Sequence, residues 1–144
     1  MGQTQLKAKQ VQRATVVTLA DNNERIQASP TQNAWYNLNS SSITLPAGTY
    51  DVTISCGHGV QKATADYLDV YTTLSTANNS ESNSEYTLRS SNALTVFTIQ
   101  SVMKRFTLTV ASETTYYVNT RTTTSSTNPI YRTNLLVTAI RVYP

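Results

Sequence analysis

The stretch that decides the fold is ITLPAGTYDVTISC, residues 43–56. Pro46, Ala47 and Gly48 form a tight turn between two segments in which apolar and polar residues alternate. In the second segment the residues that share the apolar face are Tyr50, Val52, Ile54 and Cys56. A period of two residues is the spacing of a β-strand with one buried face. The stretch therefore predicts a strand, a turn and a second strand that faces a core.

The composition bounds the class of protein. A chain of 144 residues fits one domain, which at this size buries roughly 70% of the surface that the unfolded chain exposes. Charged residues make up 13% of the chain, about half the usual share, and Thr, Ser and Asn take their place. The sequence has no apolar run long enough for a membrane span and no apolar centre of a signal peptide near its start. We expect an all-β protein of the kind found outside cells or in particles, with no membrane insertion.

Short segments with strand character recur along the chain, separated by turn residues. Beside 43–56 they are 14–20, 34–38, 67–73, 93–100, 104–110, 115–122 and 134–144. We interpret Gly57, His58 and Gly59 as a turn, because glycine permits positive φ angles. About 8–10 short strands without a convincing helix predict an antiparallel β-sandwich or barrel. The residues expected in the core are Tyr50, Val52, Ile54, Cys56, Phe106, Leu108, Val110, Leu136, Ile140 and Val142.

The final strand is apolar on both of its faces. One face carries the three residues of that strand assigned above to the core, and the opposite face is apolar as well. Such a strand is covered on both sides, either by a loop of its own domain or by a neighbouring subunit. We favour a subunit interface, and the residues predicted to form it are Phe97, Ile99, Leu135, Val137 and Tyr143.

The positive charge is mild and concentrated near the start. The net charge is +3, and Lys7, Lys9, Arg13 and Arg25 lie in the first 25 residues. We predict that Lys7, Lys9 and Arg13 belong to an extended arm that docks on a particle, the alternative being an ordinary solvated segment. The sequence contains no basic stripe with interleaved aromatic residues, so nucleic acid is not an expected partner.

Residues that could support catalysis or bind a metal are few. His58 is the only histidine and Cys56 the only cysteine, so one chain can form neither a disulfide nor a structural zinc site. Asp66 and Asp69, three residues apart, fall on opposite faces of a strand rather than across one cleft. The sequence has no nucleophile elbow and no phosphate-binding glycine loop. We therefore expect no enzymatic activity, no catalytic residue, no metal and no cofactor, with His58 on the surface or capping a turn.

Tyrosine is the dominant aromatic residue, with nine Tyr against two Phe and one Trp. A tyrosine ring can be buried while its hydroxyl stays polar, which suits interfaces and contact with sugars as well as half-buried core positions. The aromatic residues predicted to face a ligand are Trp35, Tyr71, Tyr86 and Tyr131.

Several motifs, taken in their order, resemble those of a known family. They are ITLPAGTYDVTISC (43–56), YLDVYTT (67–73), RFTLTVASETTYYVNTRTTT (105–124) and TAIRVYP (138–144). This order resembles the C-terminal domains of bacteriophage tail fibres and related virion proteins, and it covers roughly residues 34–144. The resemblance implies a trimeric jelly roll like those of tumour necrosis factor and the complement globular heads. It transfers no catalytic residue.

The resemblance divides the chain into an N-terminal arm with the first strand (1–33) and a jelly-roll-like β-sandwich (34–144). It implies a non-enzymatic bacteriophage virion protein, a homotrimer that contacts capsid or tail proteins. About 33 residues precede the matching region, too few for a fibre shaft. If the chain is a whole gene product, a head decoration protein or short fibre is favoured. The alternatives are a receptor-binding fibre tip that contacts bacterial surface glycans and, more distantly, a carbohydrate-binding module.

Overall fold

The computed structural model describes residues 14–60, 68–92, 98–123 and 129–143. Strands dominate these ranges, and none of the helices there is long and apolar enough to cross a membrane. The elements are β1 (Val16–Asp21), β2 (Arg25–Gln27), η1 (Leu38–Ser40), β3 (Ser42–Leu45), β4 (Gly48–Val60), β5 (Leu68–Ser75), η2 (Ser84–Tyr86), β6 (Thr87–Asn92), β7 (Thr98–Val110), β8 (Thr114–Thr122) and β9 (Ile130–Val142), where η marks a 3-10 helix.

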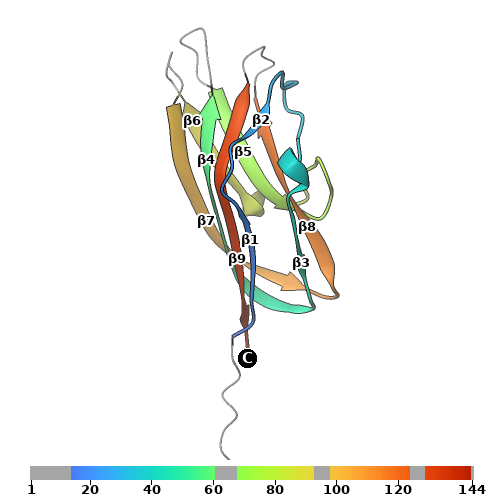
Figure 1. Ribbon diagram of the computed structural model, residues 1–144. Coiled ribbons are helices and arrows are strands. Elements are labelled where there is room, and N and C mark those ends of the chain that lie inside the picture. Colours follow the sequence, from blue (N-terminus) through green and yellow to red (C-terminus); the bar gives the residue numbers. More distant parts are fainter. Residues whose placement is uncertain (1–13, 61–67, 93–97, 124–128, 144) are drawn as a thin grey trace, which may run out of the picture.

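The strands form two antiparallel sheets that lie face to face (Figure 1). A five-stranded sheet has the order β1-β9-β4-β7, with β2 also pairing with β9, and a four-stranded sheet has the order β3-β8-β5-β6. β3 and β4 lie in different sheets, as do β7 and β8, so the chain repeatedly crosses between the layers. The predicted antiparallel, jelly-roll-like β-sandwich is confirmed. β1 and β2, which precede residue 34, are part of this sandwich.

The turn at residues 46–48 is a corner between the sheets. It joins β3 of one sheet to β4 of the other, instead of closing a hairpin within one sheet. The Tyr50 hydroxyl donates a hydrogen bond to the Pro46 carbonyl oxygen at 2.9 Å, which fixes the corner against the start of β4. Gly48 has a φ angle of +155°, and a Cβ atom there would lie 2.7 Å from the Nε atom of Arg141. The corner therefore needs glycine at this position.

The main hydrophobic core lies between the sheets, and β4 supplies much of it. Its four predicted core residues, Tyr50 to Cys56 at every second position, are all buried. Leu108 and Val110 of β7 are buried as predicted, and Phe106 is half-buried against the same cluster. Residues 68–71 alternate as expected, with Leu68 and Val70 facing inward, while Thr72 and Thr73 are both buried.

The prediction for β9 is wrong, because its two faces are interchanged. Leu136, Ile140 and Val142, expected in the core, are 42%, 41% and 49% exposed. The inward residues are Leu135, Val137 and Ala139, none more than 1% exposed. The reason is the register with β4, in which Ala139 lies opposite Val52 and Val137 opposite Ile54. Residues directly opposite in an antiparallel pair share a face, so the inward face of β4 selects this set.

Three segments differ from their predicted structure. Residues 34–38 do not form a strand; a single bridge joins Tyr36 to Thr120, and η1 begins at Leu38. Gly57 and Gly59 lie inside β4 rather than in a turn. One continuous strand, β7, replaces the two predicted around residue 100, and residues 93–97 lie outside the described ranges.

A layer of buried polar side chains divides the core. Along β4 the inward positions are Cys56, then His58, then Val60, so an apolar, a polar and an apolar residue follow one another. The same order occurs on β5, where Thr72 takes the polar place, and on β9, where Arg132 takes it. On the far side of this layer is a smaller apolar cluster, formed by Val60, Leu68, Val70 and Ile130.

Arg132 is the only charged residue among those that the structure describes as fully enclosed. Its Nη2 atom donates to the Leu38 carbonyl oxygen at 3.0 Å and to the Ser41 hydroxyl at 2.8 Å. Its Nη1 atom donates to the Val118 carbonyl oxygen at 3.3 Å, and an Asp21 carboxylate oxygen lies 3.6 Å from Nη2. Arg132 thus ties β9 of one sheet to β8 of the other and to the turn before β3.

Candidate functional site

Within the described ranges, the exposed large apolar side chains lie on the outer face of the five-stranded sheet. Every large hydrophobic residue that is exposed within the described ranges points outward from this sheet. We call these residues the outer apolar face: Val16, Ile26, Ile99, Met103, Leu136, Ile140 and Val142. Exposed apolar residues gathered on one face of a protein often mark a contact surface, so this face is a candidate.

Strand register shows how these residues are spaced over the sheet. Val16 of β1 lies directly opposite Ile140 of β9. Leu136 of β9 and Met103 of β7 both lie opposite Ser55 of β4, from its two sides. Residues directly opposite share a face at a Cβ separation of about 5 Å, so Val16 and Ile140 are direct neighbours, whereas Ser55 lies between Leu136 and Met103.

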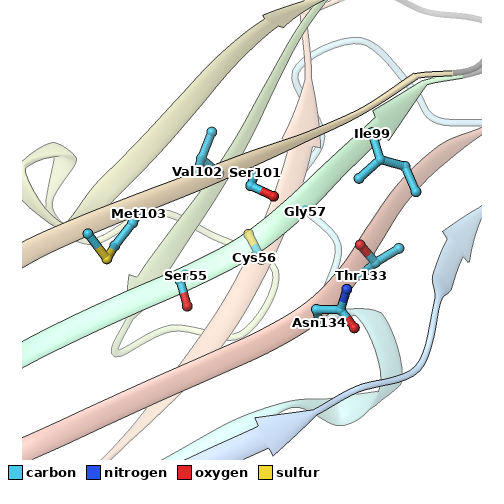
Figure 2. A pocket seen from close by; sticks show the side chains of 9 residues that line it. All are labelled: Ser55, Cys56, Gly57, Ile99, Ser101, Val102, Met103, Thr133 and Asn134. Atoms are coloured by element: carbon cyan, nitrogen blue, oxygen red, sulfur yellow. The ribbon is translucent and has the colours of Figure 1, made fainter.

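A depression interrupts this surface where β4 has glycine. Its volume is about 350 Å³, and the surrounding side chains come from β4, β7 and β9 (Figure 2). The lining residues are Ser55, Cys56, Gly57, Ile99, Ser101, Val102, Met103, Thr133 and Asn134. The pairing of β4 with β9 shifts register here, and Asn134 takes a left-handed conformation with a φ angle of +49°. The hollow therefore coincides with a β-bulge.

Thr133 is one of the residues that line this depression. Thr133 is 7% exposed, and its Oγ1 atom has no hydrogen-bond partner among the described residues. A Cβ atom on Gly57 would lie 2.3 Å from this Oγ1 atom and 2.8 Å from the Cγ2 atom of Ile99. Gly57 therefore allows two side chains of neighbouring strands to close over the backbone of β4.

We predict that Gly57→Ala destabilises the chain by about 1–3 kcal/mol, because both contacts are shorter than packed atoms tolerate. This loss outweighs the gain of about 0.4–1 kcal/mol that alanine brings by restricting the unfolded chain. Urea unfolding would measure it. Adding Thr133→Ala removes the closer contact, so the double variant should lose less than the sum of the single changes. Equal stability of Gly57→Ala and the parent would contradict the contact described here.

One ion pair crosses the outer apolar face. The Arg105 guanidinium on β7 donates to the Asp51 carboxylate on β4, with its Nε atom 2.7 Å from Oδ1. The hydrogen bond from Arg105 lowers the pKa of Asp51 below its usual value of 3.8. Since Arg105 is 72% exposed, water screens the pair strongly, and it offers an orienting charge rather than much stability.

The residues predicted at a subunit interface do not all lie on this face. Ile99 does, at 44% exposed, whereas Phe97 lies outside the described ranges. For Leu135 and Val137 the prediction is wrong, because both are buried in the core through the interchange of faces on β9. Tyr143 is half-buried at the end of β9, and its hydroxyl lies 3.0 Å from that of Thr15. Lys7, Lys9 and Arg13 of the predicted docking arm lie outside the described ranges.

Two of the aromatic residues predicted to face a ligand lie together, with an arginine between them. The Cζ atom of Arg121 is 5.0 Å from the centre of the Trp35 ring and 4.3 Å from that of Tyr71. Arg121 and Tyr71 lie on the outer face of the four-stranded sheet, on the opposite side of the sandwich from the outer apolar face, and Trp35 precedes the residue that bridges to β8. Arg121 is not among the predicted site residues; its one signal in the sequence is its place between Thr120 and Thr122, both of which are buried.

The other two aromatic residues occupy different places. Tyr86 stacks on Phe106 with ring centres 4.6 Å apart, at the margin of the main core. Tyr131 is half-buried on β9, opposite Ile26 of β2, and so borders the outer apolar face. The four aromatic residues therefore do not form one ligand site.

His58 is fully buried, so the prediction of a surface or capping histidine is wrong. Its Nδ1 atom lies 2.9 Å from the Ser90 hydroxyl and its Nε2 atom 2.7 Å from the Thr72 hydroxyl. Burial lowers its pKa to about 3, and burial raises the pKa of the Cys56 thiol to about 11. Neither group faces solvent, where a substrate could reach it. Among the described residues no group of His, Cys, Asp and Glu gathers closely enough to hold a metal ion.

Comparison with known proteins gives matches in structure alone. No protein-family model matches the chain, and no curated protein sequence matches it. Among solved structures, the VP2 subviral particle of infectious bursal disease virus superposes with a TM-score of 0.52 at 14% identity. The Gx strain of that virus gives 0.51 at 16% identity, and Eiger TNF from S. frugiperda gives 0.50 at 6% identity.

The chain has a jelly-roll fold. Each of these matches covers 90% of the chain, and at these identities the likeness concerns the fold alone. The chain spans about a third of the length of the viral proteins, 33% and 34%, but 93% of the length of Eiger. The jelly-roll unit therefore accounts for most of the TNF protein and for one part of each viral protein.

Proposed function

We propose that this chain is a non-enzymatic structural protein of a virus particle, and that it assembles through its outer apolar face. The observation that carries the proposal is the placement of every exposed large hydrophobic residue of the described ranges on that one face. The likeness to VP2 of a subviral particle supports the virion location.

The assembly proposed is a homotrimer. Three copies arranged around a threefold axis form a closed ring in which each copy buries the same surface, so no apolar face remains open. The motif resemblance to trimeric phage domains and the likeness to a TNF protein support the number three. The finer proposal is a bacteriophage head decoration protein or short fibre, with Lys7, Lys9 and Arg13 contacting capsid or tail proteins.

The test of assembly is the mass in solution. We expect the chain at micromolar concentration to sediment with three times its chain mass of 15.9 kDa. Ile140→Glu should give a folded monomer, because Ile140 is at the surface of the single chain and a charge in a dry interface costs several kcal/mol.

Two matched variants separate assembly from folding. Thr44→Glu places the same charge on an exposed position of β3, in the other sheet, and should leave the mass unchanged. Val137→Glu, on the buried face of the same strand as Ile140, should unfold the chain instead of dissociating it. A parent chain that is a monomer at micromolar concentration would refute the proposed assembly.

A second candidate function is recognition of a ligand on a host surface, as a receptor-binding fibre tip would require. The observation that favours it is the group formed by Trp35, Arg121 and Tyr71, which lies away from the outer apolar face. In a map of the particle, attachment through the N-terminus flat on the capsid would support decoration, and continuation into a shaft would support the fibre tip.

A further inference from the structure

The outer apolar face carries one negative and one positive side chain, and the two are paired. Strand register identifies the outward positions of this sheet, because residues directly opposite one another share a face. Within the described ranges of β1, β2, β4, β7 and β9, the only charged residues at outward positions are Asp51 and Arg105. The described part of the face is therefore electrically neutral, although the whole chain has a net charge of +3.

This ion pair lies among the exposed apolar residues rather than beside them. Asp51 of β4 is directly opposite Ile140 of β9, which is 41% exposed. Arg105 is two residues from Met103 along β7, and Met103 is 73% exposed. A contact that covers both Ile140 and Met103 must therefore also cover Asp51 and Arg105, and it removes this pair from water.

The pair satisfies only one side of the Arg105 guanidinium. Its Nε atom donates to the two Asp51 carboxylate oxygens, at 2.7 Å from Oδ1 and 3.0 Å from Oδ2, and its Nη2 atom also donates to Oδ2. These contacts use one edge of a group that has five N–H donors. The Arg105 side chain is 72% exposed, so in the single chain water solvates the rest of the guanidinium and a partner can reach it.

A dry contact over this face takes that water away. Charged groups leave water at a high cost unless their remaining donors and acceptors find partners. A second copy of the chain offers the same neutral face, on which a carboxylate and a guanidinium are available in equal number. A partner with a surface of one sign would instead place a like charge against either Asp51 or Arg105. Charge complementarity therefore selects a second copy as the occupant of this face.

We propose that Asp51 and Arg105 of neighbouring copies pair across the assembly and determine which chains assemble together. This inference rests on the proposed assembly and adds the residues that set its specificity. Charged groups at an interface contribute more to the choice of partner than to affinity, because a like charge in the same place is strongly unfavourable. The two proposals are separable, since an assembly can form through apolar contacts alone while this pair acts only within each chain.

The test is a charge swap. Asp51→Arg combined with Arg105→Asp reverses both signs, so the pair is kept within the chain and between two swapped chains, whereas a swapped chain beside a parent chain brings like charges together. The swapped chain and a mass-tagged parent are unfolded in urea, mixed, refolded together and measured by native mass spectrometry. We expect the swapped chain to assemble with itself, and mixed assemblies to be depleted at least about tenfold below the share for random mixing.

The matched control uses the ion pair on the other sheet. Asp69→Arg combined with Arg89→Asp reverses a pair whose Nη2 and Oδ2 atoms lie 2.7 Å apart, on the outer face of the four-stranded sheet. This control should mix with the tagged parent at random, as the untagged parent does. Circular dichroism establishes that each chain is folded before mixing, and a swap to lysine and glutamate replaces either variant that folds poorly.

Each outcome decides between the two proposals. Random mixing of the swapped chain at positions 51 and 105 would overturn this inference and leave the assembly intact. Exclusion of the parent by both swapped variants would also overturn it, because the effect would then be general. A folded swapped chain that remains a monomer would contradict it too, since the reversed pair offers the same attraction. A parent chain that is itself a monomer would refute the assembly and this inference with it.

Discussion

Replacing Arg132 by methionine should lower the free energy of unfolding by about 3–5 kcal/mol, the range for breaking a buried charged network. Methionine fills much of the space but removes the guanidinium donors to the Val118 carbonyl oxygen and the Ser41 hydroxyl, and it leaves the Leu38 carbonyl oxygen with the Ser41 hydroxyl as its donor. Each buried acceptor left unsatisfied loses its hydration without replacement. Urea unfolding followed by circular dichroism would measure the loss.

The Arg132→Lys variant is the matched control. Lysine keeps the charge beside Asp21 but cannot reach several acceptors with a planar fork, so we expect a smaller loss and a folded protein. The Arg132 contacts also hold the turn at Asn39 and Ser40, whose φ angles of +63° and +50° are unusual for residues other than glycine. A loss below about 1 kcal/mol in the methionine variant would mean that water replaces the guanidinium.

Acidification below about pH 6.5 should destabilise the fold through His58, because the pKa of this residue falls from 6.5 to about 3 on folding. Burial is the larger cause, and the charge of Arg132 acts in the same direction. Between these two pKa values the unfolded chain binds a proton that the folded chain does not. The free energy of unfolding therefore falls as pH drops through this window, by up to ~1.4 kcal/mol per pH unit.

The control for this effect is His58→Gln, which can still hydrogen-bond to Thr72 and Ser90 but does not titrate. Stability should be compared between about pH 7 and about pH 5, where histidine changes charge and ordinary carboxylates do not. We expect the slope of stability against pH to be clearly flatter in the variant. The same slope in both proteins would show that His58 takes up its proton in the folded state.

The sequence predicted the fold class and the inward face of β4, because one-sided alternation is unambiguous there. Tyr50, Val52 and Ile54 alternate with Asp51 and Thr53, so only one choice of face buries apolar groups. The corner at Pro46 was also recognisable from its residue types. What the sequence left undetermined was which sheet each strand joins, since that depends on pairing between distant segments.

The face of β9 could not be chosen from its own sequence. Both sets of alternating residues are apolar, so hydrophobic periodicity gives two solutions of similar value. The register with β4 decides between them, and a shift of one residue exchanges the faces. This is why Leu135 and Val137 were assigned to an interface and Leu136 and Ile140 to the core, the reverse of their positions.

The polar residues of the core, and Arg121 between Trp35 and Tyr71, could not be recognised from their residue types. Gly57 and Gly59 suggested a turn around His58, although glycine inside a strand also marks a bulge or close contact of backbones. Arg132 and Arg121 occur on strands where arginine usually faces solvent, and neither position shows its contacts in the local pattern. Trp35 and Tyr71 were selected by chemical type, but only the fold places Arg121 between them.

The layer of His58, Thr72 and Arg132 also bears on how the molecule opens. Hydrophobic stabilisation scales with buried apolar area, so the smaller cluster beyond this layer, around Val60 and Ile130, holds its end of the sandwich less firmly than the main cluster holds the other. Amide protons at that end should exchange with solvent through partial opening, whereas those near Val52 should exchange only on global unfolding. The amides of the single strand β4 then have two degrees of protection from hydrogen exchange, and the boundary between them falls at His58.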